Sequence, residues 1–230
     1  MKKMYLFLSM VTVFALALSA CAPAAPVATE PPAPTAVPPT AVPPTATEAP
    51  PAVGSAEHPI KVLFVPSVDA NVIVTGGEVM AAALKEATGL NFEVVVPTSY
   101  AATIEEMCAS PTDTMAFIPA FGYVLANDLC GVDVAFKAVR RGWGVYWTMI
   151  VVARDSDIDS IDDLNGKKFA FPDAGSTSGF LVPSVMLKDA GVTVGEELEA
   201  GGHPQAVRAV YTGEADFAAA FYSPWAAPEG

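Results

Sequence analysis

Short apolar segments alternate with helical patterns along this chain from residue 60 onward. Residues 60–65 and 91–96 are apolar runs of strand length, and residues 77–88 place their apolar side chains on one helical face before a glycine. The same order returns with an apolar run at 115–118 and a helical pattern at 121–128. Strands and helices in this order predict a mostly parallel sheet covered by helices, which binds ligands beyond the carboxyl ends of its strands.

A second set of elements begins near residue 145, where the chain becomes apolar again. The expected strands are 146–153, 168–171 and 215–220, and the expected helices are 181–190 and 204–211, with a glycine-rich loop at 199–203. We therefore predict an α/β chain with a first lobe at 57–143 and a second lobe at 144–230.

The N-terminal part of the chain has the composition of a targeting signal and a spacer. Two lysines precede an apolar stretch that is short for a membrane span, so residues 1–20 are expected to be a signal peptide. The stretch ends in Leu18-Ser19-Ala20-Cys21, which resembles a bacterial lipobox and implies cleavage before Cys21 and a lipid on its thiol. A plain secretory signal is the alternative, which leaves Cys21 without a role. Residues 21–56, rich in Pro, Ala and Thr, predict an extended spacer.

The charge of the chain restricts its partners. The net charge of −13 at pH 7 argues against a nucleic acid, because no basic stripe is present to neutralise phosphates. A small anion is compatible with an acidic chain, since local dipoles decide binding inside a cleft.

Two cysteines remain once Cys21 is assigned to the lipid. An extracytoplasmic location favours a disulfide between Cys108 and Cys130, which would stabilise the fold by about 3 kcal/mol. Two buried free thiols are the alternative.

Three consecutive hydroxyl residues form the most informative motif for function. Ser176, Thr177 and Ser178 stand between two glycines, after an expected strand and just before an expected helix. The first turn of a helix offers unpaired N–H groups and a partial positive charge, and glycines allow a close approach of the backbone. This segment predicts a cradle of neutral donors for an oxyanion. The simpler alternative is that one of the three hydroxyls caps the helix.

A series of short motifs extends over residues 60–220. In chain order they are Phe64-Val65-Pro66-Ser67, Ala116-Phe117, Ile161-Asp162-Asp163-Leu164-Asn165-Gly166-Lys167, Ser176-Thr177-Ser178-Gly179, Gly202-His203 and Gly213-Glu214-Ala215-Asp216. In this order they resemble the substrate-binding proteins of ABC importers, in particular the phosphonate-, phosphite- and phosphate-binding family. The resemblance implies a type II periplasmic-binding fold, in which two α/β lobes clamp the ligand in a cleft. It also implies a C-terminal truncation at Gly230, with the second lobe and the hinge return incomplete.

The same resemblance implies the residues of a binding site. The Ser-Thr-Ser segment is expected to grip the anion, with Tyr100 from the first lobe and His203 closing over it. Phe117 stands where phosphonate binders often have a tyrosine, so one hydroxyl donor is lost. A packed or capping role for His203 and a partly buried loop position for Tyr100 are the alternatives. Tyr146 and Tyr222 are further cleft candidates, and Tyr146 otherwise packs with neighbouring tryptophans.

Patterns typical of catalysis are weak in this chain. A threonine stands at the centre of the Gly-x-x-x-Gly frame around the hydroxyl residues, so the frame lacks the serine of a nucleophile elbow. Neither a Cys-x-x-Cys nor a His-x-x-x-His spacing for a metal occurs. We therefore expect a binding protein without enzymatic activity, cofactor or metal.

Together these features predict an extracytoplasmic, lipid-anchored and monomeric solute receptor of an ABC importer. It is expected to capture a phosphonate, phosphite or phosphate by lobe closure and to pass it to permease and ATPase subunits. A receptor for a sulfonate or a thiamine-like compound, and a surface sensor domain that does not transport, are the alternatives.

Overall fold

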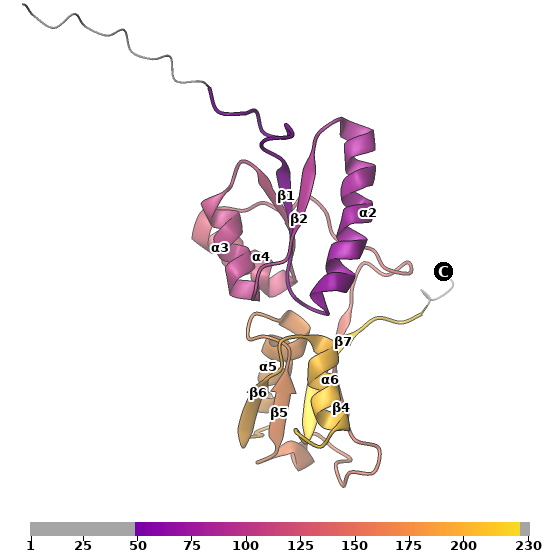
Figure 1. Ribbon diagram of the computed structural model, residues 1–230. Coiled ribbons are helices and arrows are strands. Elements are labelled where there is room, and N and C mark those ends of the chain that lie inside the picture. The colour runs from indigo at the N-terminus through magenta and orange to yellow at the C-terminus, as the bar shows by residue number, and fades with distance from the viewer. Residues whose placement is uncertain (1–48, 226–230) are drawn as a thin grey trace, which may run out of the picture. The chain divides into compact units, whose positions relative to one another are not determined.

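The computed structural model describes residues 49–225 (Figure 1). The expected signal peptide, the lipidated Cys21 and most of the expected spacer lie outside the described residues. Within the described part, no helix is long and apolar enough to cross a membrane.

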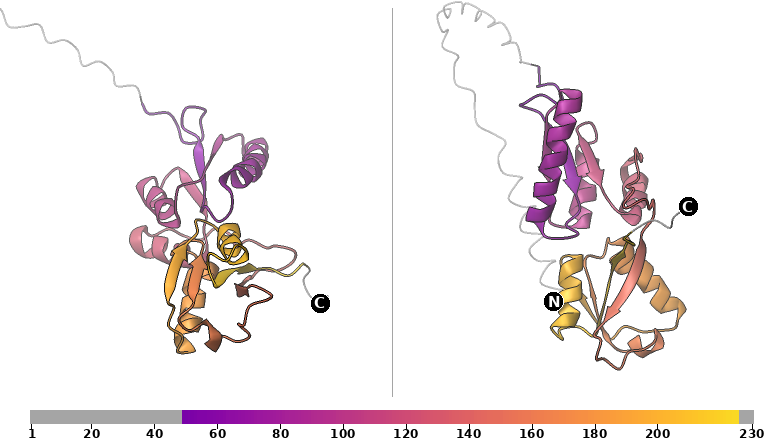
Figure 2. Two further views of the ribbon diagram at one scale, coloured as in Figure 1. Left: turned by 60° about the horizontal axis from the view of Figure 1, so that its bottom comes forward. Right: turned by 90° about the vertical axis from the view of Figure 1, so that its right-hand side faces the viewer.

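The first sheet is parallel and has the strand order β2-β1-β3. Its strands are β1 (Ile60–Phe64), β2 (Phe92–Val95) and β3 (Thr114–Phe117), and its helices are α2 (Ala70–Thr88), α3 (Tyr100–Ala109) and α4 (Ala120–Cys130). Helix α2 lies on one side of the sheet, and α3 and α4 lie on the other (Figures 1 and 2). The predicted alternation of strands and helices is confirmed in this part of the chain.

Helix α2 begins seven residues before the predicted start at residue 77. Asp69 caps it, because its side chain accepts a hydrogen bond from the backbone N–H of Asn71 at 2.9 Å. The pair Gly76-Gly77 lowers the local helix propensity and conceals this first part of the helix from sequence analysis. Packing against the sheet explains the glycine at residue 77, because a Cβ there would lie 2.7 Å from a methyl group of Val94 on β2.

The second sheet has the strand order β4-β7-β5-β6. Its strands are β4 (Trp147–Val152), β5 (Lys168–Phe171), β6 (Glu196–Glu199) and β7 (Phe217–Tyr222), and its helices are α5 (Val182–Asp189) and α6 (His203–Tyr211). Strand β5 pairs in parallel with β6 and β7, whereas β4 is antiparallel to β7. Strand β6 was not predicted, because its sequence Glu-Glu-Leu-Glu lacks the apolar run of a buried strand.

The two faces of the second sheet have different cores, as the alternation of side chains along a strand requires. Phe169, Phe171 and Phe217 face the cluster that contains Leu187 of α5. On the opposite face, small residues of β5 and β7 pack against α6 in a cluster of Ala170, Ala206, Ala209, Val210, Ala215 and Ala218. These alanines allow α6 to lie close to the sheet and bring its N-terminus to the carboxyl end of β5.

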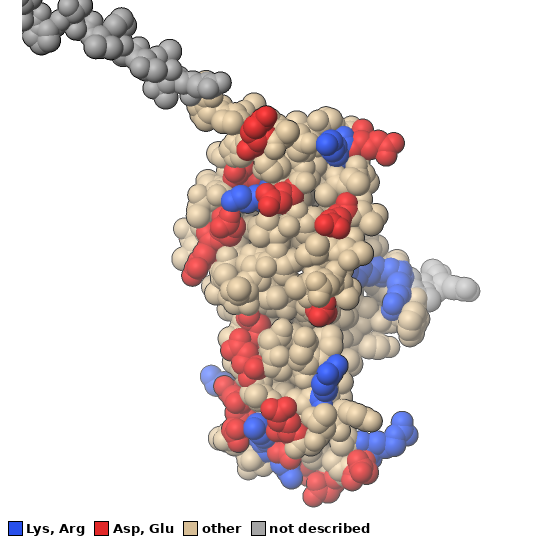
Figure 3. Space-filling model, viewed as in Figure 1, with Lys and Arg blue, Asp and Glu red and all other residues tan. Residues whose placement is uncertain are grey.

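The segment 131–146 connects the two sheets. Arg140 and Trp143 exchange two backbone hydrogen bonds of 2.9 Å across a tight turn, in which Arg141 has a φ of 54°. The ring of Trp143 packs edge-on against Trp147 with 5.1 Å between centroids, which agrees with the expected packing of these tryptophans. On the face shown in Figure 3, acidic and basic side chains are interspersed over most of the surface, and no basic patch extends across it.

Candidate functional site

The Ser-Thr-Ser segment lies at the carboxyl end of β5 and opens a helical stretch. Ser176 precedes a short π-helical turn, η2 (Thr177–Leu181), and its hydroxyl accepts a hydrogen bond from the N–H of Gly179 at 3.1 Å. Ser176 is therefore the cap that the simpler alternative allowed, and the helical stretch begins earlier than predicted. Ser176 and Ser178 are buried, with 2% and 4% of their surface exposed. Both residues thus lie in the interior of the protein.

Tyr100 is the first residue of α3 and is 3% exposed. Burial raises the pKa of Tyr100 to about 12, although a side-chain hydrogen bond with Ser176 acts in the opposite direction. The phenol therefore remains protonated at neutral pH and is a neutral hydrogen-bond donor. The position of Tyr100 at a helix start differs from the loop position that the sequence indicated.

Asp173 is a buried site residue that the sequence analysis missed. Its Oδ2 accepts a hydrogen bond from the N–H of Tyr100 at 3.1 Å, and its Oδ1 accepts one from the N–H of Gly175 at 2.7 Å. The second bond closes a local turn of the kind that aspartate favours, and the Asp-x-Gly spacing was the available signal. A Cβ on Gly175 would lie 2.8 Å from the Cβ of Tyr100, so the absence of a side chain lets the two segments meet.

Thr177 connects the segment to α4. Its Oγ1 accepts a hydrogen bond from the N–H of Phe121 at 2.9 Å, while Pro119 at the N-cap position makes no capping bond of its own. A hydroxyl 56 residues away in sequence therefore satisfies one of the N–H groups that the first turn of a helix leaves unpaired. The neighbouring carbonyl of Ser178 accepts a hydrogen bond from the hydroxyl of Thr148, which fixes η2 to β4.

His203 is the first residue of α6 and lies beside η2. Its backbone N–H donates to the carbonyl of Ser67 at 2.9 Å, and its ring meets Phe221 edge-on at 5.0 Å. A Cβ on Gly179 would lie 3.0 Å from Cε1 of this imidazole, which places the ring against the Ser-Thr-Ser segment. The imidazole is 7% exposed, and its Nδ1 has no hydrogen-bond partner among the described residues. Burial lowers the pKa of His203 to about 4, so the ring is neutral at pH 7.

The remaining predicted site residues lie at the margin or elsewhere. Tyr146 is close enough to Tyr100 to raise the pKa of that phenol. Phe117 is 42% exposed and stacks on Phe64, with 4.9 Å between ring centroids. Tyr222 is the last residue of β7, rather than a residue after it, and its ring faces Trp147 at 6.4 Å. The structure therefore brings together Tyr100, His203 and the Ser-Thr-Ser segment, whereas the rings of Phe117 and Tyr222 pack on Phe64 and Trp147.

The assembled residues offer neutral donors rather than cations. A hydroxyl that accepts a backbone N–H, as that of Thr177 does, keeps its own proton for donation to a ligand. The hydroxyl of Ser176 also shares a hydrogen bond with the phenol of Tyr100. The first turns of α4 and α6 lie beside this segment with their partial positive charges, whereas the first turn of α3 is capped by the carboxylate of Asp173. Between residues 49 and 225 no group of three or more His, Cys, Asp and Glu could hold a metal ion. This arrangement is chemically suited to an oxyanion.

Comparison with known proteins identifies a matching family and a similar protein. The family described as "ABC transporter, phosphonate, periplasmic substrate-binding protein" matches residues 62–229. The phosphate-import protein PhnD of Mycolicibacterium smegmatis is 32% identical over an alignment of 152 residues, which covers 60% of this chain and 47% of that protein. The chain thus spans about half the length of this relative.

Two solved structures have a similar fold. A binding protein component of an ABC phosphonate transporter from Pseudomonas aeruginosa aligns with a TM-score of 0.61 and 21% identity, over 71% of this chain and 57% of that one. PhnD1 from Prochlorococcus marinus, in complex with methylphosphonate, aligns with a TM-score of 0.61 and 20% identity, over 70% and 62% of the two chains. Both likenesses confirm the predicted periplasmic-binding fold.

Proposed function

The chain belongs to the family of phosphonate periplasmic substrate-binding proteins of ABC transporters, and from this premise we propose that it captures a small tetrahedral oxyanion for import. The ligand is a phosphonate, phosphite or phosphate, and the receiving partners are a permease and an ATPase. The observation that carries the proposal is the meeting of Tyr100, His203 and the buried Ser-Thr-Ser segment at the first turns of helices.

Binding proceeds through closure of the two lobes over the anion. The hydroxyls and N–H groups of the Ser-Thr-Ser segment hold the oxygens from the second lobe, and the phenol of Tyr100 approaches from the first. His203 is neutral and can donate or accept, according to which of its ring nitrogens carries the proton. These groups bind and orient the anion and offer no activated nucleophile, so the protein acts as a receptor and not as an enzyme.

A triple substitution of Ser176, Thr177 and Ser178 by alanine tests the site in the full-length protein. A hydrogen bond to a charged group contributes about 1.5–3 kcal/mol, so the loss of three should weaken affinity by more than about a thousandfold. Isothermal titration with methylphosphonate, phosphite and phosphate measures this change. Thr88→Ala, at the exposed end of α2, is the matched control and should bind like wild type. Undiminished binding by the triple variant would show that the anion is held elsewhere.

A second ligand class is favoured by one observation. Phe117 supplies no hydroxyl at the end of β3, so one donor expected for a phosphonate is missing. A sulfonate or a thiamine-like compound is therefore the alternative ligand, and a sensor role without transport is the alternative use of the same fold. Including methanesulfonate, sulfate and thiamine in the titration panel decides between the ligands.

The anchor is part of the same proposal. A lipid on Cys21 and the spacer to residue 56 would hold the receptor outside the cytoplasmic membrane as a monomer. Cys21→Ser should then move the protein from the membrane fraction to the soluble extracytoplasmic fraction without changing ligand affinity. Retention in the membrane fraction of a variant whose signal peptide has been removed would refute lipid anchoring.

A further inference from the structure

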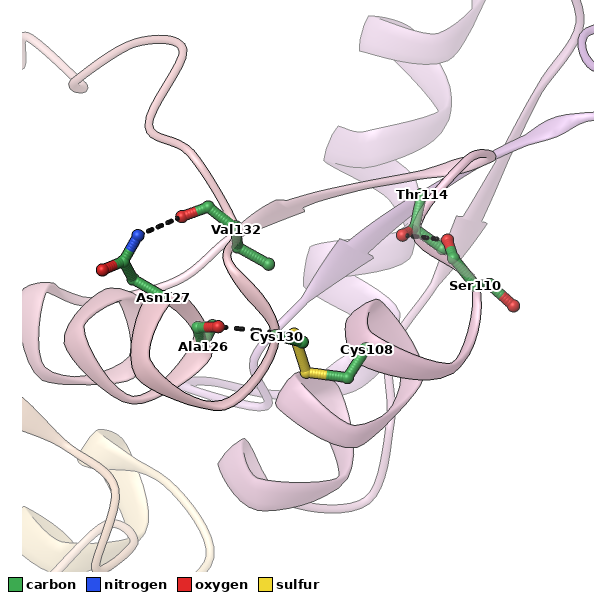
Figure 4. The surroundings of a disulfide bond; sticks show 7 residues. All are labelled: Cys108, Ser110, Thr114, Ala126, Asn127, Cys130 and Val132. Atoms are coloured by element: carbon green, nitrogen blue, oxygen red, sulfur yellow. Dashed lines mark hydrogen bonds between the residues drawn. A yellow bond between two sulfur atoms is a disulfide. The ribbon is translucent and has the colours of Figure 1, made fainter.

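A disulfide joins the carboxyl ends of the two helices that face the Ser-Thr-Ser segment. Cys108 lies in the last turn of α3 and Cys130 is the last residue of α4, with 5.6 Å between their Cα atoms (Figure 4). The predicted cysteine pairing is thus present. Gly131, in the left-handed region at a φ of 70°, ends α4 directly after the bridge.

The two helices have almost equal lengths of 10 and 11 residues, or about 15 Å each. The opposite ends of both helices make contacts with the same short stretch of the second lobe. The N–H of Tyr100 bonds to Asp173, and the N–H of Phe121 bonds to Thr177. The pair is therefore covalently tied at one end and docked on the oxyanion segment at the other.

The parallel arrangement of the pair has an electrostatic consequence. The positive end of α4 meets Thr177 and that of α3 meets the carboxylate of Asp173, and side by side the two helix ends repel each other. Helices α3 and α4 contact each other, which opposes this repulsion, and Ile104 and Met107 of α3 and Ala126 of α4 are buried. The disulfide adds a fixed point at the negative ends.

We propose that the Cys108–Cys130 disulfide is a positioning device for ligand binding, because it makes α3 and α4 dock on Asp173 and Thr177 as one unit. The inference rests on the proposed function of the same site. A tilt of about 10° at the disulfide end displaces a helix N-terminus by roughly 2.6 Å over a length of about 15 Å. Such a displacement separates the N–H of Tyr100 from Asp173 and draws the phenol of Tyr100 away from Ser176.

A disulfide that only stabilises the fold would have a different effect on ligand affinity. A cross-link that acts on the unfolded chain changes the population of folded protein but leaves the Kd of the folded protein unchanged. Loss of a positioning disulfide raises the Kd of the folded protein itself. The rise comes mainly from faster dissociation, because the docked closed state is then held less firmly.

The first experiment compares the full-length protein with the variant Cys108→Ala/Cys130→Ala. Titration calorimetry and stopped-flow fluorescence with methylphosphonate are carried out at a temperature where circular dichroism shows both proteins folded. We expect at least a tenfold rise in Kd, carried by faster dissociation. Val192→Ala lowers Tm through the second-lobe core, away from α3 and α4, and should leave Kd unchanged. An unchanged Kd in the cysteine variant overturns the inference.

A second experiment keeps the disulfide and so does not depend on folding of the cysteine variant. Asp173→Asn and Thr177→Val each remove one docking acceptor, and their effects on Kd are combined in a double-mutant cycle. If the helices dock as one unit, the second substitution has little docking left to remove. The Kd of the double variant should then be at least threefold lower than the value expected from multiplying the two single increases in Kd. Multiplicative effects would show that α3 and α4 dock independently and would overturn the inference. Failure of the wild-type protein to bind any oxyanion would instead refute the proposed function.

Discussion

His203 should make the stability of this protein depend on pH in a way that one substitution removes. Burial holds the pKa of the folded-state imidazole at about 4, against an ordinary value of 6.5. Between these values the unfolded chain binds a proton that the folded protein does not, so the free energy of unfolding rises with pH across this window. The contribution is fully present above pH 6.5 and is lost as the pH falls toward 4. Since one pKa unit corresponds to 1.36 kcal/mol, the loss is about 3 kcal/mol.

The assay is urea unfolding, followed by tryptophan fluorescence, at several pH values between 4 and 7.5 in buffers free of phosphate and sulfate. As the pH falls across this range, the free energy of unfolding of wild type should drop by about 3 kcal/mol more than that of His203→Gln, because glutamine does not titrate. Comparing the two proteins removes the contribution of the carboxylates that they share. Equal pH slopes in wild type and His203→Gln would refute a buried neutral histidine beside the Ser-Thr-Ser segment.

His58 is the natural control, because it is the only other histidine in the chain. Its Nε2 lies 2.7 Å from Oδ2 of Asp113, and this hydrogen bond raises the pKa of His58. The sign of its contribution is therefore opposite: it is present below pH 6.5 and is lost as the pH rises through the folded pKa. His58→Gln should leave the acid-side loss of stability intact, whereas His203→Gln should remove it.

Two further substitutions test the geometry of the site. Gly179→Ala should lower the free energy of unfolding by about 1–3 kcal/mol and weaken oxyanion binding, because the added Cβ would meet the ring of Pro172. Chemical unfolding and titration calorimetry measure the two effects. Wild-type values in both would contradict the packing described. Phe117→Tyr should fold normally, since residue 117 is 42% exposed. If a hydroxyl at this position is a ligand donor, the variant should bind phosphonate about tenfold more tightly. Unchanged affinity in calorimetry would show that residue 117 does not contact the ligand.

The sequence was sufficient for features that depend on local patterns. Apolar runs separated by helical periodicity predicted six of the strands in order, and the three adjacent hydroxyls indicated the segment beside which Tyr100 and His203 lie. Patterns failed where tertiary pairing decides the structure. Strand β6 carries three glutamates and exists because its backbone pairs with β5, and the start of α2 was concealed by two glycines. Neither feature has a signal in the hydrophobic periodicity.

The contacts of the site residues were even less accessible to sequence reasoning. The hydroxyl of Thr177 was expected to meet a ligand, and the structure adds a backbone partner in α4 that is 56 residues away. Asp173 was overlooked because its local turn with Gly175 is an ordinary role for an aspartate. Its second bond, to the first residue of α3, spans 73 residues and gives it a role in the site.

Three of the bonds between the lobes share a physical origin that bears on how the receptor closes. The N–H groups of Tyr100, Phe121 and His203 all belong to the first turn of a helix, and all find their acceptor in the other lobe. When the lobes separate, water replaces these acceptors, so each bond contributes only about 0.5–1.5 kcal/mol net to closure. A sum of a few kcal/mol is comparable to the gaps between conformations of a two-state protein. Under the proposed function, closure without ligand is then close to balance, and the hydrogen bonds of a bound oxyanion determine which state is populated.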